Sequence, residues 1–180
     1  MAEQFPSLSA ELMQWIGEQP IYFVATAARA GRVNLSPKGQ DSLRVLNAQE
    51  LLWLNLTGSG NETAAHLQDL NRMTLMWCAF AGAPRILRVY GRATTIHPRD
   101  DAWSACSELL PPPLGARQYF RVQIEQVQTS CGYAVPELSY ERDRDVLTRW
   151  AQQRGEDGIH AYWAAKNQSS IDGLPTGILD

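Results

Sequence analysis

The feature that most constrains the fold is a series of about seven short β-forming segments separated by turn residues. Residues 119–125 alternate most cleanly, because Phe120, Val122 and Ile124 are separated by polar residues, as in a strand with one buried face. Residues 21–27 are apolar at both alternations and predict a central strand. The other predicted strands are 33–35, 42–46, 51–56, 72–80 and 85–96, with 131–135 as a candidate last strand.

Helical periodicity occurs near both ends of the chain and at two places between the strands. Residues 8–16 predict a helix capped by Ser7 or Ser9. Further helices are expected at 61–70 and from Pro98 to about residue 110, and two helical segments close the chain around 146–151 and 159–163. The tail from residue 167 to 175 is polar and rich in turn residues, and we expect partial order against a neighbouring surface.

This order of elements predicts a mainly β (α+β) fold. We expect a closed antiparallel split barrel of six to seven strands with peripheral helices, because closure removes exposed sheet edges. Residues 36–41 are expected to form a polar turn, and Gly91 predicts a bulge or sharp bend within its strand. The length of 180 residues suits a single domain, 1–180, with an N-terminal helix at about 7–17 and a C-terminal helical extension at about 143–180.

The stretch 51–70 most invites a functional interpretation. A short apolar run leads into a glycine-rich turn at 57–61, and a helix-forming segment follows. Such a turn can aim backbone N–H groups and the positive end of a helix dipole at a phosphate. Ser59 and Glu62 also fit a capping box, which would satisfy the same N–H groups without a ligand. The residues of this stretch leave both interpretations open.

Several function classes are excluded or disfavoured by the sequence. The glycine spacing matches neither a dinucleotide fingerprint nor a P-loop, and no Gly-x-Ser-x-Gly elbow occurs. His66, His97 and His160 are isolated, which disfavours a metal site, and we expect His66 to be at the surface or half-buried. The net charge of −3 argues against nucleic-acid binding, and no apolar run approaches the roughly 20 residues of a membrane span. Three separated cysteines and the lack of a signal peptide favour a cytoplasmic protein.

Four segments in this order resemble the pyridoxamine 5′-phosphate oxidase-like family of flavoproteins. They are residues 33–39, 42–46, 56–67 and 87–93, and the likeness extends over about residues 20–130. The resemblance implies the FMN-binding split barrel, a homodimer with two FMN sites at the subunit interface, and redox chemistry carried by the flavin on an unidentified small molecule. No catalytic side chain is marked in the sequence.

The resemblance also implies a set of FMN-binding residues. By position, one group would face the flavin ring and ribityl chain, and a second would surround the phosphate. Two arginines would come from the partner subunit or a neighbouring strand, and one lysine would add a positive charge. The group at the flavin ring and ribityl chain is Ser42, Leu43, Arg44 and Val45, and the group at the phosphate is Thr57, Ser59, Asn61 and Thr63. The arginines are Arg85 or Arg88, and the lysine is Lys38.

Two departures from the family pattern bear on the function. The oxidases open the helix after the glycine-rich turn with Ser-Arg-Lys, whereas this chain has Asn61, Glu62 and Thr63. The chain also lacks the C-terminal Trp and Arg-rich motif that holds the pyridoxal substrate, so strict pyridoxamine phosphate oxidation is not expected. The alternatives to an FMN oxidoreductase are a non-enzymatic flavin-binding or sensor protein and a split barrel that holds heme or deazaflavin.

Overall fold

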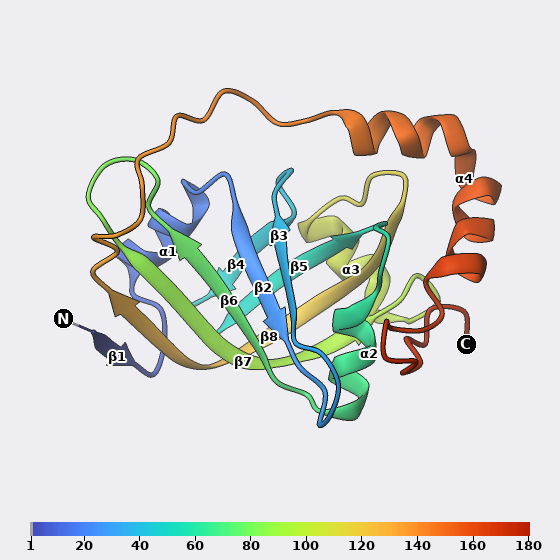
Figure 1. The fold of residues 1–180 in the computed structure, drawn as a ribbon, viewed down its shortest axis with the longest axis horizontal. Helices are drawn as coiled ribbons and strands as arrows, with labels where there is room; N and C mark the ends of the chain where they lie inside the picture. The colour runs from blue at the N-terminus through green and yellow to red at the C-terminus, as the bar shows by residue number, and fades with distance from the viewer. Residues whose placement is uncertain (1) are drawn as a thin grey trace.

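An antiparallel sheet of eight strands, with four helices around it, forms the body of the protein in a computed structural model that describes residues 2–180 (Figure 1). In chain order the elements are β1 (Glu3–Phe5), α1 (Ala10–Gly17), β2 (Tyr22–Thr26), β3 (Asn34–Lys38), β4 (Leu43–Asn47), β5 (Glu50–Leu56), α2 (Glu62–Asp69), β6 (Met73–Cys78), β7 (Ile86–Ile96), α3 (Ala102–Leu109), β8 (Ala116–Ser130) and α4 (Val146–Lys166). No helix among these described residues is both long enough and apolar enough to cross a membrane.

The sheet curls but does not close. Its strand order is β3-β2-β6-β7-β8-β5-β4, with β1 paired to β8, so β3 and β4 are its two ends. The chain between them turns through left-handed backbone at Gln40 and Asp41, and β4 then pairs with β5 instead of β3. The prediction of a closed barrel is therefore wrong, and the opening lies between the two end strands, β3 and β4.

Strand β3 also differs from the prediction of a turn at 36–41. Its ladder with β2 continues through Pro37 to Lys38. Proline has no N–H to donate, and an edge strand is a place where the missing donor leaves no second neighbour unsatisfied. The open end of the sheet therefore tolerates a residue that a central strand would not.

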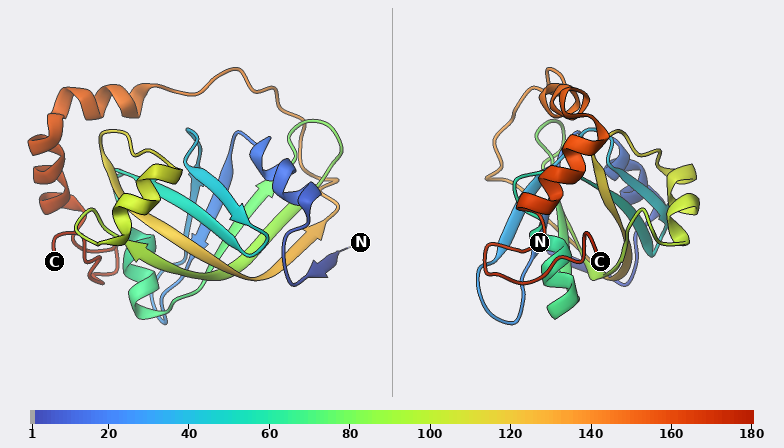
Figure 2. Two further views of the ribbon diagram at one scale, coloured as in Figure 1. Left: turned by 180° about the vertical axis from the view of Figure 1, so that it is seen from behind. Right: turned by 90° about the vertical axis from the view of Figure 1, so that its right-hand side faces the viewer.

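Burial on both faces explains the apolar run of β5. Leu51 and Trp53 face the main core, where the Trp53 ring stacks on Phe120. Leu52 and Leu54 face the opposite way and pack with α3 through Cys106. Seen from behind, α1 and α3 both lie in front of the sheet (Figure 2).

The predicted details of β7, β8 and α1 are confirmed. Phe120, Val122 and Ile124 are buried along β8, and the register shifts beside Gly91, as expected for a bulge. Ser9 is the cap of α1, where its Oγ accepts a hydrogen bond from the Leu12 N–H at 3.2 Å.

The chain beyond β8 differs from the sequence-based expectation. Residues 131–135 are irregular, because the chain turns at Gly132 (φ 54°) against the backbone of Arg85. The following segment arches to α4, which changes direction at Gly155 (φ 65°) (Figure 1). The tail then folds onto the body of its own chain, where Arg99 donates to the carbonyl oxygens of Gly177 and Ile178.

Candidate functional site

A cavity of about 1000 Å³ lies at the opening of the sheet. Its walls come from β3 and the following turn, the end of β5, the glycine-rich loop 57–61, the start of α2, and the C-terminal segment. This volume is at the upper end of the range for small-molecule and cofactor sites. The stretch that the sequence singled out therefore forms one wall of this cavity.

The start of α2 does not contain the capping box. Asn61 occupies the cap position, and no side chain makes a cap hydrogen bond there. Glu62 instead accepts from the Ile171 N–H, with both carboxylate oxygens at 3.1 Å. Of the two interpretations of this stretch, the capping box is wrong, and the first N–H groups of α2 stay without a side-chain acceptor.

A buried amide cluster supports the helix start from below. The Asn61 Oδ1 accepts from Asn55 Nδ2 at 3.4 Å and from Gln118 Nε2 at 3.2 Å, and Asn55 also donates to Gln118 Oε1 at 3.0 Å. Among residues 2–180 the Asn61 Nδ2 has no hydrogen-bond partner, although the side chain is buried. A buried donor without an acceptor is costly, so this atom is available to a ligand.

Two cations, Lys38 and Arg117, line the cavity and pair with no carboxylate among residues 2–180, although Glu62 also lines it. Arg117 is 3% exposed; its Nη1 donates to Gly60 O at 2.8 Å and Asn167 Oδ1 at 2.9 Å, while its Nε has no partner. Lys38 is half-buried, with Nζ 5.0 Å from the centre of the Trp53 ring. Within residues 2–180 neither side chain forms an ion pair. Two such cations on one cavity favour an anionic ligand.

The pKa values of these cations respond to the same surroundings. Burial, together with the nearby charge of Arg117, lowers the pKa of Lys38 to about 8. Burial lowers the pKa of Arg117 to about 10. Both shifts show that the folded chain disfavours the charged forms, which an anion in the cavity would favour.

His66 is a further polar residue in the same wall. It is 1% exposed, so the expectation of a surface or half-buried side chain is wrong. Its Nδ1 lies 3.0 Å from Thr26 Oγ1, which accepts from Asn34 Nδ2 at 3.3 Å. Which of the two atoms donates depends on the tautomer of the ring, and among residues 2–180 the Nε2 atom has no hydrogen-bond partner.

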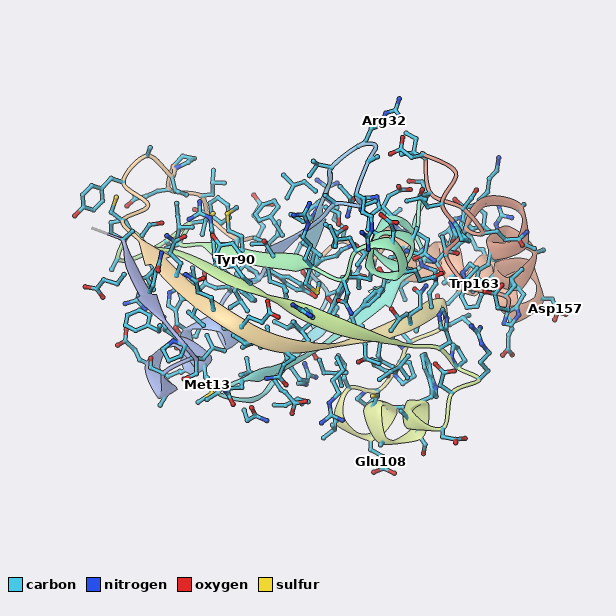
Figure 3. The ribbon with its side chains drawn as sticks, turned by 90° about the horizontal axis from the view of Figure 1, so that it is seen from below. Met13, Arg32, Tyr90, Glu108, Asp157 and Trp163 are labelled. Atoms are coloured by element: carbon cyan, nitrogen blue, oxygen red, sulfur yellow. The ribbon has the colours of Figure 1, made fainter. Side chains whose placement is uncertain are left out.

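The C-terminal tail borders the cavity through Ser169, Ser170 and Ile171. Asp172 accepts from the Arg32 N–H at 2.6 Å and pairs with its guanidinium at the tip of the β2–β3 hairpin. Figure 3 shows Arg32 at this tip, beside the tail. The tail is thereby attached to both the hairpin and, through Ile171, to α2.

The structure gathers only part of the residue set that the sequence predicts. Ser42 is shared with a second cavity of about 280 Å³ under α1, which Leu43, Arg44 and Val45 also line. Six of the predicted residues line the large cavity: Lys38, Ser42, Thr57, Ser59, Asn61 and Thr63.

The remaining arginines have partners elsewhere. Arg44 donates from Nη2 to Asp41 Oδ2 at 2.8 Å. Arg85 pairs with Glu11 at 2.7 Å, and Arg88 donates to Ser130 Oγ at 3.2 Å. Arg85 and Arg88 line neither of the two cavities described here.

Sequence reasoning missed Arg117, Gln118 and Asn55. One signal was present: Asn55 is a polar residue inside the apolar run of β5. Arg117 and Gln118 are both buried and precede the alternating pattern that begins at Tyr119. Arg117 is held by Asn167 of the C-terminal segment, a contact that no local pattern reveals. Within residues 2–180, no group of three histidine, cysteine or carboxylate side chains could hold a metal ion.

Comparison with known proteins gives consistent results. A sequence model of the family described as pyridoxamine 5′-phosphate oxidase matches residues 8–131. The pyridoxamine 5′-phosphate oxidase family protein ustO of Aspergillus flavus is 34% identical over 191 residues, which cover 95% of this chain and 76% of that protein.

Two solved structures share the fold. A candidate pyridoxamine 5′-phosphate oxidase from Lactobacillus delbrueckii has a TM-score of 0.54 at 21% identity and covers 68% of this chain and 94% of its own. HupZ of Group A Streptococcus has a TM-score of 0.53 at 16% identity and covers 67% of this chain and 91% of its own. At these identities the likeness extends to the fold alone.

Proposed function

The chain belongs to the pyridoxamine 5′-phosphate oxidase-like family, and from this premise we propose that it binds FMN in the large cavity and acts as a flavin-dependent oxidoreductase on a small molecule. When bound, FMN would supply the transfer of hydride or electrons. The protein would bind and orient the flavin and exclude water. The substrate that we propose is a small molecule of unspecified identity, and the proposal does not extend to pyridoxamine 5′-phosphate.

The observation that carries the proposal is that Lys38 and Arg117, which form no ion pair among residues 2–180, line the same cavity as the start of α2, where no side chain makes a cap hydrogen bond. A phosphate at this point would accept from the Arg117 guanidinium, the Lys38 ammonium and the Asn61 amide. It would also accept from the first N–H groups of α2. The donor set therefore fits the terminal phosphate of FMN although the Ser-Arg-Lys motif of the oxidases is missing.

We further propose a homodimer with the cavity at the seam between two copies. In support, the cavity rim includes the exposed apolar side chains of Val33 and Leu35, along an edge strand. Arg85 and Arg88 would take a binding role only by reaching the partner's cavity. A cytoplasmic location is part of the same proposal, supported by three free cysteines.

Titration of the purified protein with FMN tests the binding site. We expect Arg117→Gln to weaken FMN binding roughly 10- to 100-fold, as for the loss of a charge-assisted hydrogen bond. Riboflavin, which lacks the phosphate, should bind the variant and the wild type equally. Arg121→Gln is the matched control, because Arg121 lies on the same strand but pairs with Glu50 outside the cavity. Thermal unfolding of both variants monitors folding.

Two results would contradict the proposal. One is wild-type protein that binds neither FMN nor riboflavin at micromolar concentrations. The other is an Arg117→Gln variant that is folded and retains wild-type FMN affinity. Anaerobic reduction of the bound flavin by NADH or NADPH, followed by turnover with electron acceptors, separates an oxidoreductase from a non-enzymatic flavin binder. The absorption spectrum of fresh protein separates both from a heme protein.

A further inference from the structure

The C-terminal segment forms part of the cavity although it lies outside the part of the chain that matches the family model. That match ends at residue 131, whereas Lys166, Ser169, Ser170 and Ile171 line the cavity. Trp163 lies on the side of α4 that faces the rest of the molecule, and Asp157 points outward (Figure 3). The inner side of this segment is therefore placed to act on the glycine-rich loop.

Trp163 holds the first residue of that loop. Its Nε1 donates to Thr57 Oγ1 at 2.8 Å, and the Thr57 hydroxyl donates to Gly115 O at 2.6 Å. Trp163 is 5% exposed, so this hydrogen bond is shielded from water. Thr57 is thereby fixed from α4 on one side and from the start of β8 on the other.

Asn167 holds the middle of the loop and the arginine below it. Its Nδ2 donates to Gly58 O at 3.2 Å, and its Oδ1 accepts from Arg117 Nη1 at 2.9 Å. The Asn167 side chain is fully buried. Its own carbonyl accepts from Thr176 Oγ1 at 2.6 Å, so the returning tail fixes Asn167 in turn.

These contacts matter because the loop has little stiffness of its own. Gly58 and Gly60 lack side chains that would restrict the backbone, and a Cβ at Gly58 would have no neighbour nearer than 3.9 Å. The amide cluster holds Asn61, but the residues before it depend on Arg117, Asn167 and the Thr57 hydroxyl. The position of the Arg117 guanidinium depends on the same asparagine.

We propose that Trp163 and Asn167 are positioning residues for the phosphate subsite, which they organise through Thr57, Gly58 and Arg117. This inference rests on the proposed function, since it concerns the FMN phosphate. Neither residue need touch the ligand. Their effect should therefore be confined to the phosphate-bearing flavin.

The test compares FMN with riboflavin. We expect Trp163→Phe and Asn167→Ala each to lower FMN affinity roughly tenfold, as for the loss of one or two hydrogen bonds that preorganise a site, with riboflavin affinity unchanged. Trp103→Phe is the control for the same change of side chain, because the partly buried Trp103 packs on Tyr119, 4.6 Å between ring centres, and lines neither the large cavity nor the small space beside Thr57. Trp163→Phe retains most of the buried ring and serves if Asn167→Ala fails to fold.

The outcomes are separable. A fall in the ratio of FMN to riboflavin affinity in either folded variant, without a fall in the control, supports the positioning role. Equal weakening of FMN and riboflavin binding indicates a general loss of packing and overturns the positioning role. If the wild type prefers FMN, an unchanged ratio of the two affinities in the folded variants overturns it as well. A wild type that binds no FMN overturns the proposed function and this inference together.

Discussion

Lys38 and Arg117 contribute charges that the ligand-free fold does not balance. A buried cation without a carboxylate partner costs stability, so a chain selected for stability alone would pair it or replace it. Here the Arg117 Nη1 donates to Gly60 and Asn167, and the Nε atom has no hydrogen-bond partner among residues 2–180. At the scale of single residues, the site is recognisable by the interactions it lacks.

The lowered pKa of Lys38 predicts a pH dependence of FMN binding. Its pKa is about 8 in the ligand-free fold, chiefly because of burial. A phosphate nearby favours the ammonium form, so above that pH binding must take up a proton. We expect FMN affinity to fall as pH rises from about 8 to roughly 10, by at most about tenfold per pH unit. Fluorescence titrations in constant-ionic-strength buffers measure it.

The variant Lys38→Met supplies the control for this pH profile. It should bind FMN more weakly at pH 7 and lose most of the decline above pH 8. Lys38 also affects the ligand-free protein: between about pH 8 and 10.4 the unfolded chain keeps a proton that the folded chain has released, so the contribution of Lys38 to stability rises with pH. An identical pH profile in wild type and variant would remove Lys38 from the site.

At the scale of elements, Gly91 fixes how β7 crosses β8. A Cβ at this position would lie 2.1 Å from Gln123 O and 3.1 Å from Gln123 C, both backbone atoms that cannot rotate away. We expect Gly91→Ala to lower the free energy of unfolding by about 3 kcal/mol or to prevent folding. Urea denaturation measures this change.

A second glycine gives the comparison for Gly91. Gly17 ends α1, and a Cβ there would meet no atom within 4 Å. Gly17→Ala should change the free energy of unfolding by no more than about 1 kcal/mol. Similar effects of the two substitutions would contradict the assignment of Gly91 to a bulge that only glycine fits.

Local patterns predicted most elements because their causes are local. The alternation in β8, the Ser9 cap and the mid-strand glycine each depend on residues a few positions apart. The errors arise where a distant contact decides. Pro37 continues a strand because that strand is at the sheet edge, and residues 131–135 stay irregular because Gly132 turns against Arg85.

The same division applies to the candidate site. The glycine-rich loop and Lys38 were found from the sequence and line the cavity. The capping box matched the local pattern equally well, but Glu62 is engaged by Ile171, which lies 109 residues away along the chain. Arg117 could not be found in this way, because its burial and its orientation depend on Asn167, 50 residues further on.

At the scale of the whole molecule, the failure of the sheet to close and the presence of the cavity are one fact. The two end strands, β3 and β4, leave a gap that a closed barrel would fill with ladder hydrogen bonds. Cavity walls then come from β3 and β5, and the C-terminal segment borders the remaining side. In the dimer that we propose, a second copy would complete the site through this open edge.

A dimer at this edge makes a prediction about Val33 and Leu35. Both line the cavity, and their side chains are 74% and 65% exposed. Exposed apolar side chains beside an unpaired edge strand are unfavourable in a monomer and favour association with another chain. We expect the wild type to have about twice the chain mass of 20.1 kDa in size-exclusion chromatography with light scattering. The double change Val33→Glu and Leu35→Glu should shift it to the monomer and weaken FMN retention, because two carboxylates from each chain would be buried in the interface. Leu109→Glu, on exposed α3, should leave the mass unchanged. A wild type that is monomeric when saturated with FMN would remove the seam from the proposal while leaving the cavity in place.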